Sequence, residues 1–321
     1  MKILVTGGAG FIGSNVVDAY INAGHEVVVI DNLFSGKLVN LNPKAKFYLM
    51  DIRSAEVAKV FAIEKFDLIN HHAAQMSVPA SVEDPSFDAD VNVKGFLNLL
   101  EASVRNQVKK VIFISSGGAI YGEAKEYPTS EVSQPVPLSP YAITKAVSEQ
   151  YLAFYHHQYG LDYTVLRYAN VYGPRQIPHG EAGVVAIFMD RLLNNQPCTV
   201  YHFNDEPRGM TRDYCFVGDV IQANLLALTK GSVEACNIGT TVATHTLDLF
   251  EAIYSAIKEV RPTLNEALRT PAVGAARAGD LTRSCLKVDK ARQILGFAAS
   301  HDLMAGLKKT LQWRVASIAS R

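Results

Sequence analysis

The stretch Lys2-Ile3-Leu4-Val5-Thr6-Gly7-Gly8-Ala9-Gly10-Phe11-Ile12-Gly13 decides the fold class of this chain. Its first part, Lys2–Thr6, has the apolar pattern of a buried strand, and helical periodicity begins at Phe11. Glycines between a strand and a helix permit a tight turn and let the backbone approach a pyrophosphate, which the helix N-terminus attracts. A plain glycine turn is the alternative, but the strand–turn–helix setting favours a dinucleotide-binding loop. The expected contacts are Gly7, Gly10, Phe11, Ile12 and Gly13.

The alternation of strand and helix patterns continues beyond this loop. Helices are predicted at Phe11–Ala23, Pro85–Asn106 and Pro140–Tyr159. Further strands are predicted at Glu26–Ile30, Lys46–Met50, Leu68–His71, Lys110–Ser115 and Asp162–Arg167. Such alternation indicates a parallel sheet covered by helices on both faces. With right-handed crossovers, this is a doubly wound, Rossmann-like α/β fold.

The pattern loosens after Tyr172, where the turn signals Gly173-Pro174-Arg175 and Pro178-His179-Gly180 follow one another. We expect residues 1–172 to form the cofactor-binding domain and residues 173–321 a smaller α/β substrate lobe. Helices are predicted in that lobe at Leu247–Val260 and His301–Trp313. Residues 213–236 are expected to return to the first domain, because 213–229 has the pattern of a strand followed by a helix.

The composition excludes some classes of function. Of the 321 residues, 48% are hydrophobic and 19% are charged, an ordinary balance for a globular protein. Lys plus Arg equals Asp plus Glu at 31 each. This near-zero net charge argues against nucleic-acid binding, although a local basic pocket could still hold a phosphorylated small molecule.

Cysteine use and hydropathy indicate where the protein works. Cys198, Cys215, Cys236 and Cys285 are scattered without Cys-x-x-Cys spacing, so buried reduced thiols are expected rather than a metal site or disulfides. The chain starts directly in a strand, and no apolar run approaches the roughly 18 residues that span a bilayer. We therefore expect a cytoplasmic protein that binds neither a membrane nor a metal.

The second and third strands carry acidic residues at their ends. Asp31-Asn32 ends the second strand, where a carboxylate can accept hydrogen bonds from both adenosine ribose hydroxyls and would repel a 2′-phosphate. This favours NAD over NADP, unless Asp31 caps a loop. Asp51-Ile52 ends the third strand, where an adenine would lie, but Asp51 is equally suited to cap the helix expected from Ser54 onward.

Tyr141 and Lys145 are the candidate catalytic pair. Their spacing of four residues places both side chains on one face of the helix predicted at Pro140–Tyr159. There the ammonium group can lower the pKa of the phenol, which is otherwise near ~10, and a phenolate can take a proton from a sugar hydroxyl. The spacing alone is a weak signal, because a half-buried tyrosine beside a solvated lysine produces it too.

Taken in order, these motifs resemble the extended short-chain dehydrogenase/reductase family and its NAD-dependent epimerase/dehydratase group. The resemblance spans nearly the whole chain and is strongest to enzymes of the UDP-glucose 4-epimerase type. The segments that carry it are Thr6–Gly13, Asp31–Leu33, His71–Ala74, Asn92–Gly95, Ser115–Gly122, Tyr141–Lys145, Leu166–Arg175, Arg212–Tyr214, Asn237–Thr240 and Arg277–Asp280.

The resemblance implies NAD as cofactor and a UDP-sugar as substrate. Hydride would pass from C4 of the hexose to NAD and return to the opposite face, through a transient 4-keto intermediate. Tyr141 would be the acid–base catalyst, and Lys145 would hold the nicotinamide ribose. The implied further cofactor contacts are Ala73, Ala74 and Tyr168. The implied substrate contacts are Ser116, Tyr141, Asn170, Arg175, Val184, Arg212, Arg277, Asp280 and Ser284.

Two arginines are implied as a pyrophosphate clamp. A guanidinium presents a rigid fork of donors to phosphate oxygens, which suits Arg212 and Arg277 to this role. The alternative for Arg212 is an ion pair with a carboxylate such as Asp213 or Asp219. A salt bridge is likewise the alternative for Arg277.

The chain departs from the family pattern at Gly117. The family usually has a serine or threonine there, hydrogen-bonded to the sugar O4. The hydroxyl must then come from the adjoining Ser116, from a water, or be absent. If Ser116 is only a strand-end serine bonded to the backbone, Tyr141 would transfer the proton alone.

Other functions on this fold would require residues different from those found here. A 4,6-dehydratase adds an Asp-Glu pair before the Val-Tyr-Gly stretch, whereas Gly117-Gly118-Ala119-Ile120 carries no carboxylate here. UDP-glucuronate decarboxylase is another alternative. A non-catalytic NAD-sensing protein would have lost Tyr141 or Lys145, and both are present.

Two positions bear on substrate choice. The gatekeeper of the sugar pocket in the family aligns with Ser284, and so small a residue predicts room for an N-acetyl group at C2. A slip of one residue in the alignment would make Ser284 an ordinary loop residue. The loop at 202–211 is longer than in the family, which favours a tolerated surface insertion over altered closure.

A homodimer is also implied by the resemblance, through a four-helix bundle of Pro85–Asn106 and Pro140–Tyr159. The apolar residues available for that contact, some of which must face the sheet, are Leu97, Leu100, Val104, Val147, Tyr151 and Phe154.

Overall fold

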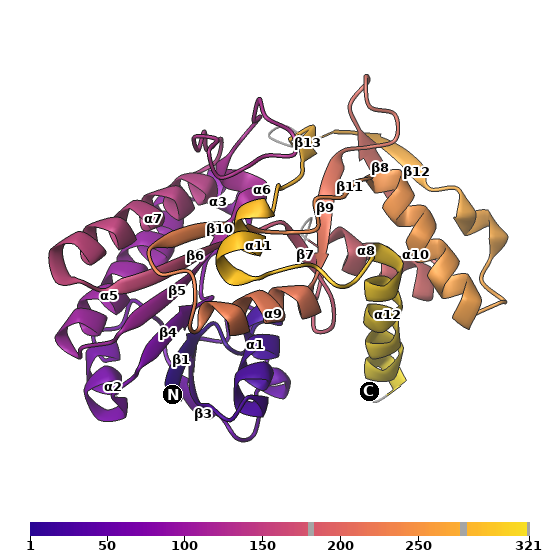
Figure 1. Ribbon diagram of the computed structural model, residues 1–321. Coiled ribbons are helices and arrows are strands. Elements are labelled where there is room, and N and C mark those ends of the chain that lie inside the picture. The colour runs from indigo at the N-terminus through magenta and orange to yellow at the C-terminus, as the bar shows by residue number, and fades with distance from the viewer. Residues whose placement is uncertain (179–182, 277–280, 320–321) are drawn as a thin grey trace.

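The structure is a computed structural model that describes residues 1–178, 183–276 and 281–319. Its larger lobe is built on seven parallel strands in the order β10-β6-β5-β4-β1-β2-β3 (Figure 1). This confirms the predicted doubly wound parallel sheet. The strands are β1 (Lys2–Thr6), β2 (Glu26–Asp31), β3 (Lys46–Leu49), β4 (Leu68–His71), β5 (Lys110–Ser116), β6 (Asp162–Tyr168) and β10 (Glu234–Ile238).

The strand order reverses between β1 and β4, which determines where a ligand can bind. β2 and β3 lie on one side of β1, whereas β4, β5 and β6 lie on the other. Connections leave the sheet in opposite directions at this point and open a crevice at the carboxyl ends of the strands. Thr6 pairs with His71 at those ends, so the glycine loop and the His71–Ala74 segment meet at the crevice.

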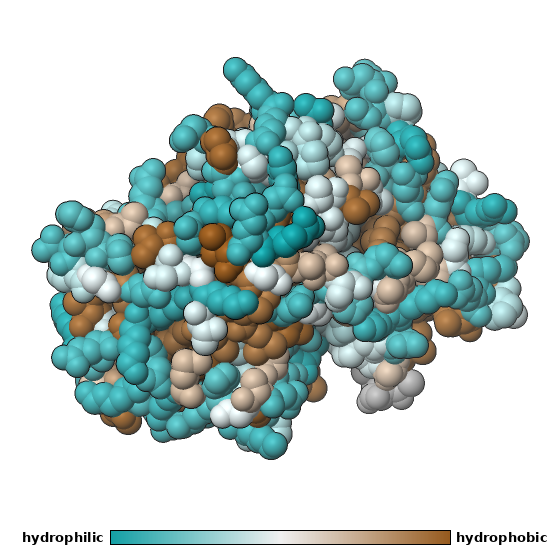
Figure 2. Space-filling view, viewed as in Figure 1, coloured by the Kyte–Doolittle hydropathy of each residue, from teal (hydrophilic) through white to brown (hydrophobic). Residues whose placement is uncertain are grey.

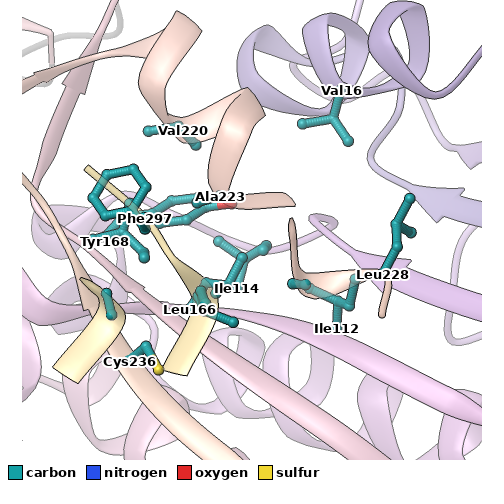
Figure 3. Close-up of a cluster of buried hydrophobic side chains, with 14 of the residues drawn as sticks. Val16, Ile112, Ile114, Leu166, Tyr168, Val220, Ala223, Leu228, Cys236 and Phe297 are labelled. Carbon is teal, nitrogen blue, oxygen red and sulfur yellow. The ribbon is translucent and has the colours of Figure 1, made fainter. Parts of the chain in front are cut away.

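Alternate strand residues point to opposite faces, and helices cover both faces. In β5, Ile112 and Ile114 pack toward α1 (Phe11–Asn22), α9 (Val217–Ala227) and α11 (Asp289–Leu295). Val111 and Phe113 pack instead toward α2 (Val57–Glu64), α5 (Gly95–Arg105) and α7 (Pro140–Tyr159). Figure 3 shows the first of these cores, with labelled residues Val16, Ile112, Ile114, Leu166, Val220 and Ala223.

The smaller lobe holds a second sheet and its own apolar core. β9 (Thr211–Phe216) pairs with β7 (Asn170–Tyr172), β11 (Ala243–His245) and β13 (Arg283–Ser284). β8 (Thr199–His202) and β12 (Ala272–Ala275) form a separate ladder. The helices of this lobe are α8 (Val184–Leu193), α10 (Thr246–Val260) and α12 (Leu303–Ala319), and α12 runs beside the gap between the lobes (Figure 1).

Short elements complete the described part of the chain. One predicted helix, Pro85–Asn106, is interrupted: α4 (Pro85–Ala89) passes through a π-helical turn, η2 (Asp90–Lys94), into α5. The remaining elements are η1 (Leu38–Asn40), α3 (Val78–Glu83), α6 (Gly117–Ile120) and η3 (Glu266–Arg269).

The segment 213–236, expected to return to the first domain, is divided between the lobes. β9 lies in the second sheet, because it pairs with β7, β11 and β13. α9 instead packs in the core beside α1, and the strand that follows it, β10, is the edge strand of the first sheet. The boundary at 172 stays a proposal.

The four cysteines are buried free thiols, as predicted. Burial raises the pKa of Cys198 to about 11 and that of Cys285 to about 12, so neither is a reactive thiolate. Within the described residues, no helix has the length and apolar character needed to span a bilayer.

Candidate active site

A cavity of about 810 Å³ lies at the carboxyl ends of the central strands, where the strand order reverses. In Figure 2 the molecular outline is indented at its lower edge, between the larger lobe and α12. The sequence-predicted residues that line the cavity are Gly7, Gly10, Phe11, Ile12, Gly13, Asp31, Asn32, Asp51, Ile52, Ala73, Ala74, Ser116, Tyr141, Lys145, Tyr168, Asn170 and Arg175.

Three predicted substrate contacts within the described residues, Val184, Arg212 and Ser284, are not among the lining residues, and two more cannot be placed. Arg277 and Asp280 lie outside the described part of the chain. Val184 begins α8, whereas Arg212 and Ser284 lie on β9 and β13 of the smaller lobe. Arg212 donates to the carbonyl oxygens of Thr211 at 2.9 Å and Leu281 at 2.8 Å.

The carboxylates named as alternative partners of Arg212 have other donors. Asp213 accepts from the hydroxyl and amide of Thr240. Asp219 accepts from Ser300 and from His301. Asp213 and Asp219 are therefore hydrogen-bonded to donors other than Arg212.

The glycine loop has the close packing that a dinucleotide site requires. Gly7 has φ +68°, and a Cβ there would lie 2.7 Å from the amide nitrogen of Ala73. A Cβ on Gly13 would lie 2.3 Å from the Gly7 carbonyl oxygen. α1 then begins without a side-chain cap and without an acidic residue in its first turn. Its free N–H groups and positive partial charge fit a pyrophosphate.

Asp31 is a buried carboxylate at the end of β2, with 7% of its surface exposed. Its oxygens accept from the amides of Ala9 at 3.0 Å and Leu33 at 2.8 Å, so it does hold the adjoining loops. A carboxylate has about four acceptor sites. Asp31 can therefore both shape the loop and accept the ribose hydroxyls of a nucleotide in the cavity that it lines.

Asp51 holds the turn after β3 rather than the first turn of α2. Its carboxylate accepts from the amide of Arg53 at 2.9 Å and pairs with the Arg53 guanidinium. The Arg53 hydrogen bond lowers the pKa of Asp51 to about 2. Asp51 also accepts from Asn32 at 2.9 Å, which ties together the ends of β2 and β3 beside the cavity.

Helix α7 positions Tyr141 and Lys145. Ser139 caps its N-terminus by accepting from the Ala142 amide at 3.2 Å, and Pro140 occupies the first turn. Lys145 is buried, donates to the Ile114 carbonyl at 2.9 Å, and lies 5.9 Å from the centroid of the Tyr141 ring. The helix therefore presents a phenol and an amine together at the end of β5.

The protein alone does not make Tyr141 acidic, contrary to the expected effect of Lys145. Burial raises the pKa of Tyr141 to about 12, against a hydrogen bond from Ser116 that lowers it. Burial also lowers the pKa of Lys145 to about 8, although Asp88 and Glu149 act in the opposite direction. Each pKa shift has the sign expected for removing a charged form from water.

Ser116 carries a hydroxyl next to Gly117, which has none. β5 extends to Ser116, whose side chain is hydrogen-bonded to Tyr141 and makes no capping bond to α6. A Cβ on Gly117 would lie 2.5 Å from a methyl carbon of Leu286. Position 117 therefore has no room for a side chain unless Leu286 moves, and the hydroxyl is found one residue earlier.

Replacing Ser116 with alanine tests whether the Ser116 hydroxyl assists proton transfer by Tyr141. Loss of the hydrogen bond raises the pKa of Tyr141, so less phenolate is present at a given pH. We expect kcat to fall roughly 10- to 100-fold, from the usual strength of a hydrogen bond to a charged group. The acidic limb of the pH profile should move to higher pH. Ser116→Thr retains the hydroxyl and is the control. If the acidic limb of the pH profile stays at the same pH in Ser116→Ala, Ser116 takes no part in the proton transfer.

A buried polar network sets the position of α7. The Asp88 carboxylate, fully buried, accepts from Thr144 at 2.7 Å and Gln75 at 2.7 Å. Asn92, in the π-helical turn, donates to Asp88 at 3.1 Å and to the Gln75 carbonyl at 2.9 Å. Asp88 and Asn92 of the interrupted helix are thus both hydrogen-bonded to Thr144, the residue before Lys145. π-Helical turns often occur at functional sites.

Sequence reasoning missed cavity-lining residues with evident chemistry. His72 lines the cavity with a buried Nε2 that has no partner among the described residues. Burial, with the charge of Lys145, lowers its pKa to about 3, so it is neutral. Trp313, the only tryptophan of the chain, lines the cavity from α12. The His71–Ala74 motif could have identified His72; no motif marked Trp313.

The chain is similar to known proteins over nearly its whole length. Residues 3–239 match the family described as the NAD dependent epimerase/dehydratase family. A UDP-glucose 4-epimerase of Thermotoga maritima, solved with UDP-glucose, is 47% identical, with a TM-score of 0.92 over 99% of this chain and 100% of that one. The UDP-glucose 4-epimerase of Thermus thermophilus, solved with NAD, is 43% identical, with a TM-score of 0.90 over 98% of each chain.

A third solved structure has a different sugar in its name. The UDP-N-acetylglucosamine 4-epimerase of Methanobrevibacter ruminantium, in complex with UDP-N-acetylmuramic acid, is 33% identical, with a TM-score of 0.90 over 98% of each chain. The fold, the glycine loop and these full-length similarities agree. The chain belongs to the NAD dependent epimerase/dehydratase family.

Proposed function

We propose that this protein inverts C4 of a UDP-hexose, interconverting UDP-glucose and UDP-galactose with NAD. The observation that carries this proposal is one cavity lined both by the dinucleotide loop and by Ser116, Tyr141 and Lys145. Full-length similarity to two UDP-glucose 4-epimerases, one solved with UDP-glucose and one with NAD, supports it. Asp31 favours NAD because a 2′-phosphate would meet its carboxylate.

The residues of the chain supply proton transfer and position. When bound, NAD supplies a reversible hydride acceptor for C4 of the sugar. Tyr141 takes the O4 proton as C4 is oxidised and returns it when the 4-keto sugar is reduced, so no proton or cofactor is consumed. Ser116 stabilises the phenolate through its hydrogen bond, and the Lys145 ammonium favours the same charged form.

The alternatives differ in the charges they need near the sugar. A 4,6-dehydratase needs an acid and a base to eliminate water across C5 and C6. Among the described residues, the carboxylates that line the cavity are Asp31 and Asp51, both at the ends of strands β2 and β3. Gly117–Ile120, which follows Ser116 as α6, offers none. Retention of the Tyr141–Lys145 pair also argues against a non-catalytic NAD-binding protein.

The substrate range includes the N-acetylated sugars in this proposal. A Cβ on Gly118 would lie 3.5 Å from Asn170 Oδ1 and 3.9 Å from Ser284 Oγ, so these three positions adjoin. Asn170 lines the cavity. Neither Gly118 nor Ser284 is among the lining residues, but both lie next to Asn170, and their small size would leave room there for an N-acetyl group. The similarity to a UDP-N-acetylglucosamine 4-epimerase supports a pocket with room for an N-acetyl group.

Ser284→Tyr should narrow the substrate range. We expect it to lower kcat/KM for UDP-N-acetylglucosamine roughly 10- to 100-fold, the usual effect of overfilling a pocket, with a much smaller effect on UDP-galactose. Ser284→Ala is the matched control and should keep both activities. Failure of the unmodified protein to convert UDP-N-acetylglucosamine, at enzyme concentrations that convert UDP-galactose, would refute the wide pocket.

A homodimer through α5 and α7 is part of the proposal. Phe154 and Ile143 on α7 are 50% and 48% exposed, and Phe87 on α4 is 38% exposed. These apolar groups suit a helical interface. Leu100, considered for the same contact, is buried in the core and cannot take part. The molar mass in solution tests the dimer.

A cytoplasmic location and a role in galactose metabolism complete the proposal. The four buried free cysteines suit a reducing compartment. Interconversion of UDP-glucose and UDP-galactose would connect the protein to galactose use.

Product analysis tests the reaction class. The protein is incubated separately with UDP-galactose, UDP-N-acetylglucosamine and UDP-glucuronate, and the products are separated by chromatography. C4 epimers are the expected products. A 4-keto-6-deoxy sugar would identify a dehydratase, and a UDP-pentose from UDP-glucuronate would identify a decarboxylase; either result would contradict the proposal.

A further inference from the structure

The Arg175 side chain is held against the helix that begins the cofactor site. It follows β7 in the loop Gly173-Pro174-Arg175, and its backbone has φ +72°. Arg175 Nη2 donates to Asp18 Oδ2 of α1 at 2.7 Å. Asn15, one turn earlier on α1, donates to the Pro174 carbonyl at 3.1 Å. A non-glycine residue in the left-handed region persists only when surrounding contacts fix it, as these do.

One nitrogen of this guanidinium has no acceptor. Arg175 Nη1 is buried and lacks a hydrogen-bond partner among the residues that the structure describes. A buried donor without an acceptor is costly, especially on a charged group, and usually indicates a ligand or water. Arg175 lines the same cavity as Gly10, Phe11 and Ile12 at the start of α1.

The charges around the cavity indicate what Arg175 binds. Arg53 is paired with Asp51 and Asp90, Lys145 lies beside Tyr141, and Lys37 is exposed to solvent. Arg175 has a single carboxylate partner, Asp18, which engages only one of its two terminal nitrogens. A guanidinium with one side free presents donors that match phosphate oxygens.

We propose that Arg175 binds a phosphate of the dinucleotide cofactor, as a second anchor beside the glycine loop, rather than the nucleotide sugar. Its anchoring contacts are to α1, the helix whose N-terminus receives the cofactor pyrophosphate. Arg212, expected to clamp the sugar-nucleotide phosphates, lies instead on β9 in the other lobe. This inference rests on NAD binding and sharpens the role of one residue expected to contact the substrate.

Arg175→Met removes the charge while keeping an unbranched stem. We expect roughly 10- to 100-fold faster loss of NAD(H) from the purified holoenzyme, the usual effect of losing a charged hydrogen bond. Trp313 lines the cavity and provides the signal, because energy transfer from its indole to bound NADH ends on release. Retained cofactor after timed gel filtration is the second readout. The KM for UDP-galactose, with NAD+ in excess, should stay unchanged.

Asp18→Asn is the matched control. It breaks the same ion pair but leaves the guanidinium in place, and a partly exposed pair contributes little, so we expect at most about fivefold faster release. Equal loss of cofactor in both variants would mean that Arg175 acts only through its ion pair. Full cofactor retention in Arg175→Met, with a raised KM for UDP-galactose, would assign it to the sugar nucleotide. Either result overturns the proposal.

The Arg175 measurement does not depend on the epimerase reaction. Adding ADP-ribose and adenosine as competitors separates the contacts further. Arg175→Met should weaken binding of ADP-ribose, which carries the pyrophosphate, and leave adenosine binding unchanged. If the unmodified protein binds NADH yet epimerises nothing, the proposed function fails and the Arg175 proposal stands. If Arg175→Met releases NADH at the unmodified rate, the Arg175 proposal fails and the proposed function stands.

Discussion

Replacing Tyr141 with phenylalanine should lower kcat for UDP-galactose roughly 10²- to 10⁴-fold, the usual contribution of a positioned acid–base group. The change removes one hydroxyl, which lines the cavity and bonds to Ser116. Because the ring remains, we expect NAD retention and thermal stability to change little. Steady-state kinetics with the bound cofactor quantified gives the result.

Tyr151→Phe is the matched control for this variant, since it removes a hydroxyl from the same helix, away from the cavity lining. It should retain the activity of the unmodified protein. A Tyr141→Phe variant within tenfold of normal kcat would mean that another group moves the O4 proton. His72 would then be the next candidate, because its neutral imidazole lines the same cavity.

The second large effect concerns stability. Arg167 and Glu149 are largely withdrawn from solvent, with side-chain exposures of 9% and 11%, and pair at 2.6 Å. Glu149 also accepts from Ser115 at 2.6 Å, and Arg167 donates to the Tyr121 hydroxyl at 2.7 Å. The pair thus joins α7 to β5 and β6 at Ser115, the residue before Ser116.

Glu149→Leu should destabilise the protein by about 3–5 kcal/mol, because it leaves the Arg167 guanidinium buried without a counter-charge. A fall of several degrees in the thermal midpoint is the expected observation, with α7 the first helix to lose amide protection in hydrogen exchange. The double variant Glu149→Leu/Arg167→Met removes both charges and should recover most of the loss. An unchanged midpoint in the single variant would show that the pair does not hold α7.

The sequence predicted the parts of the fold that depend on local pattern. The strand–turn–helix at Lys2–Gly13 follows from periodicity and glycine placement, and the helix predicted at Pro140–Tyr159 has those bounds in the structure. The break in Pro85–Asn106 could not be predicted in this way. It depends on hydrogen bonds of Asp88 to Gln75, 13 residues away in the chain, and to Thr144, 56 residues away.

The candidate site shows the same limit. The sequence left three alternatives for the hydroxyl missing at Gly117, namely Ser116, a water or none. It could not show that Leu286 fills the space beside Gly117 and leaves no room for a side chain there. The expected lowering of the Tyr141 pKa by Lys145 is not seen in the protein alone, because burial raises the pKa of Tyr141 to about 12. An oxidised nicotinamide carries positive charge and, when bound, would lower the pKa of Tyr141.

Following a deuterium label at C4 tests the proposed internal hydride transfer most directly. The purified protein is given UDP-[4-²H]galactose without added NAD, and the label is located in the UDP-glucose formed. If hydride leaves and returns within one cavity, C4 keeps its deuterium over many turnovers for each NAD bound. Loss of the label to solvent, or turnover that stops after one equivalent of cofactor, would contradict the reaction proposed for Tyr141, Lys145 and Ser116.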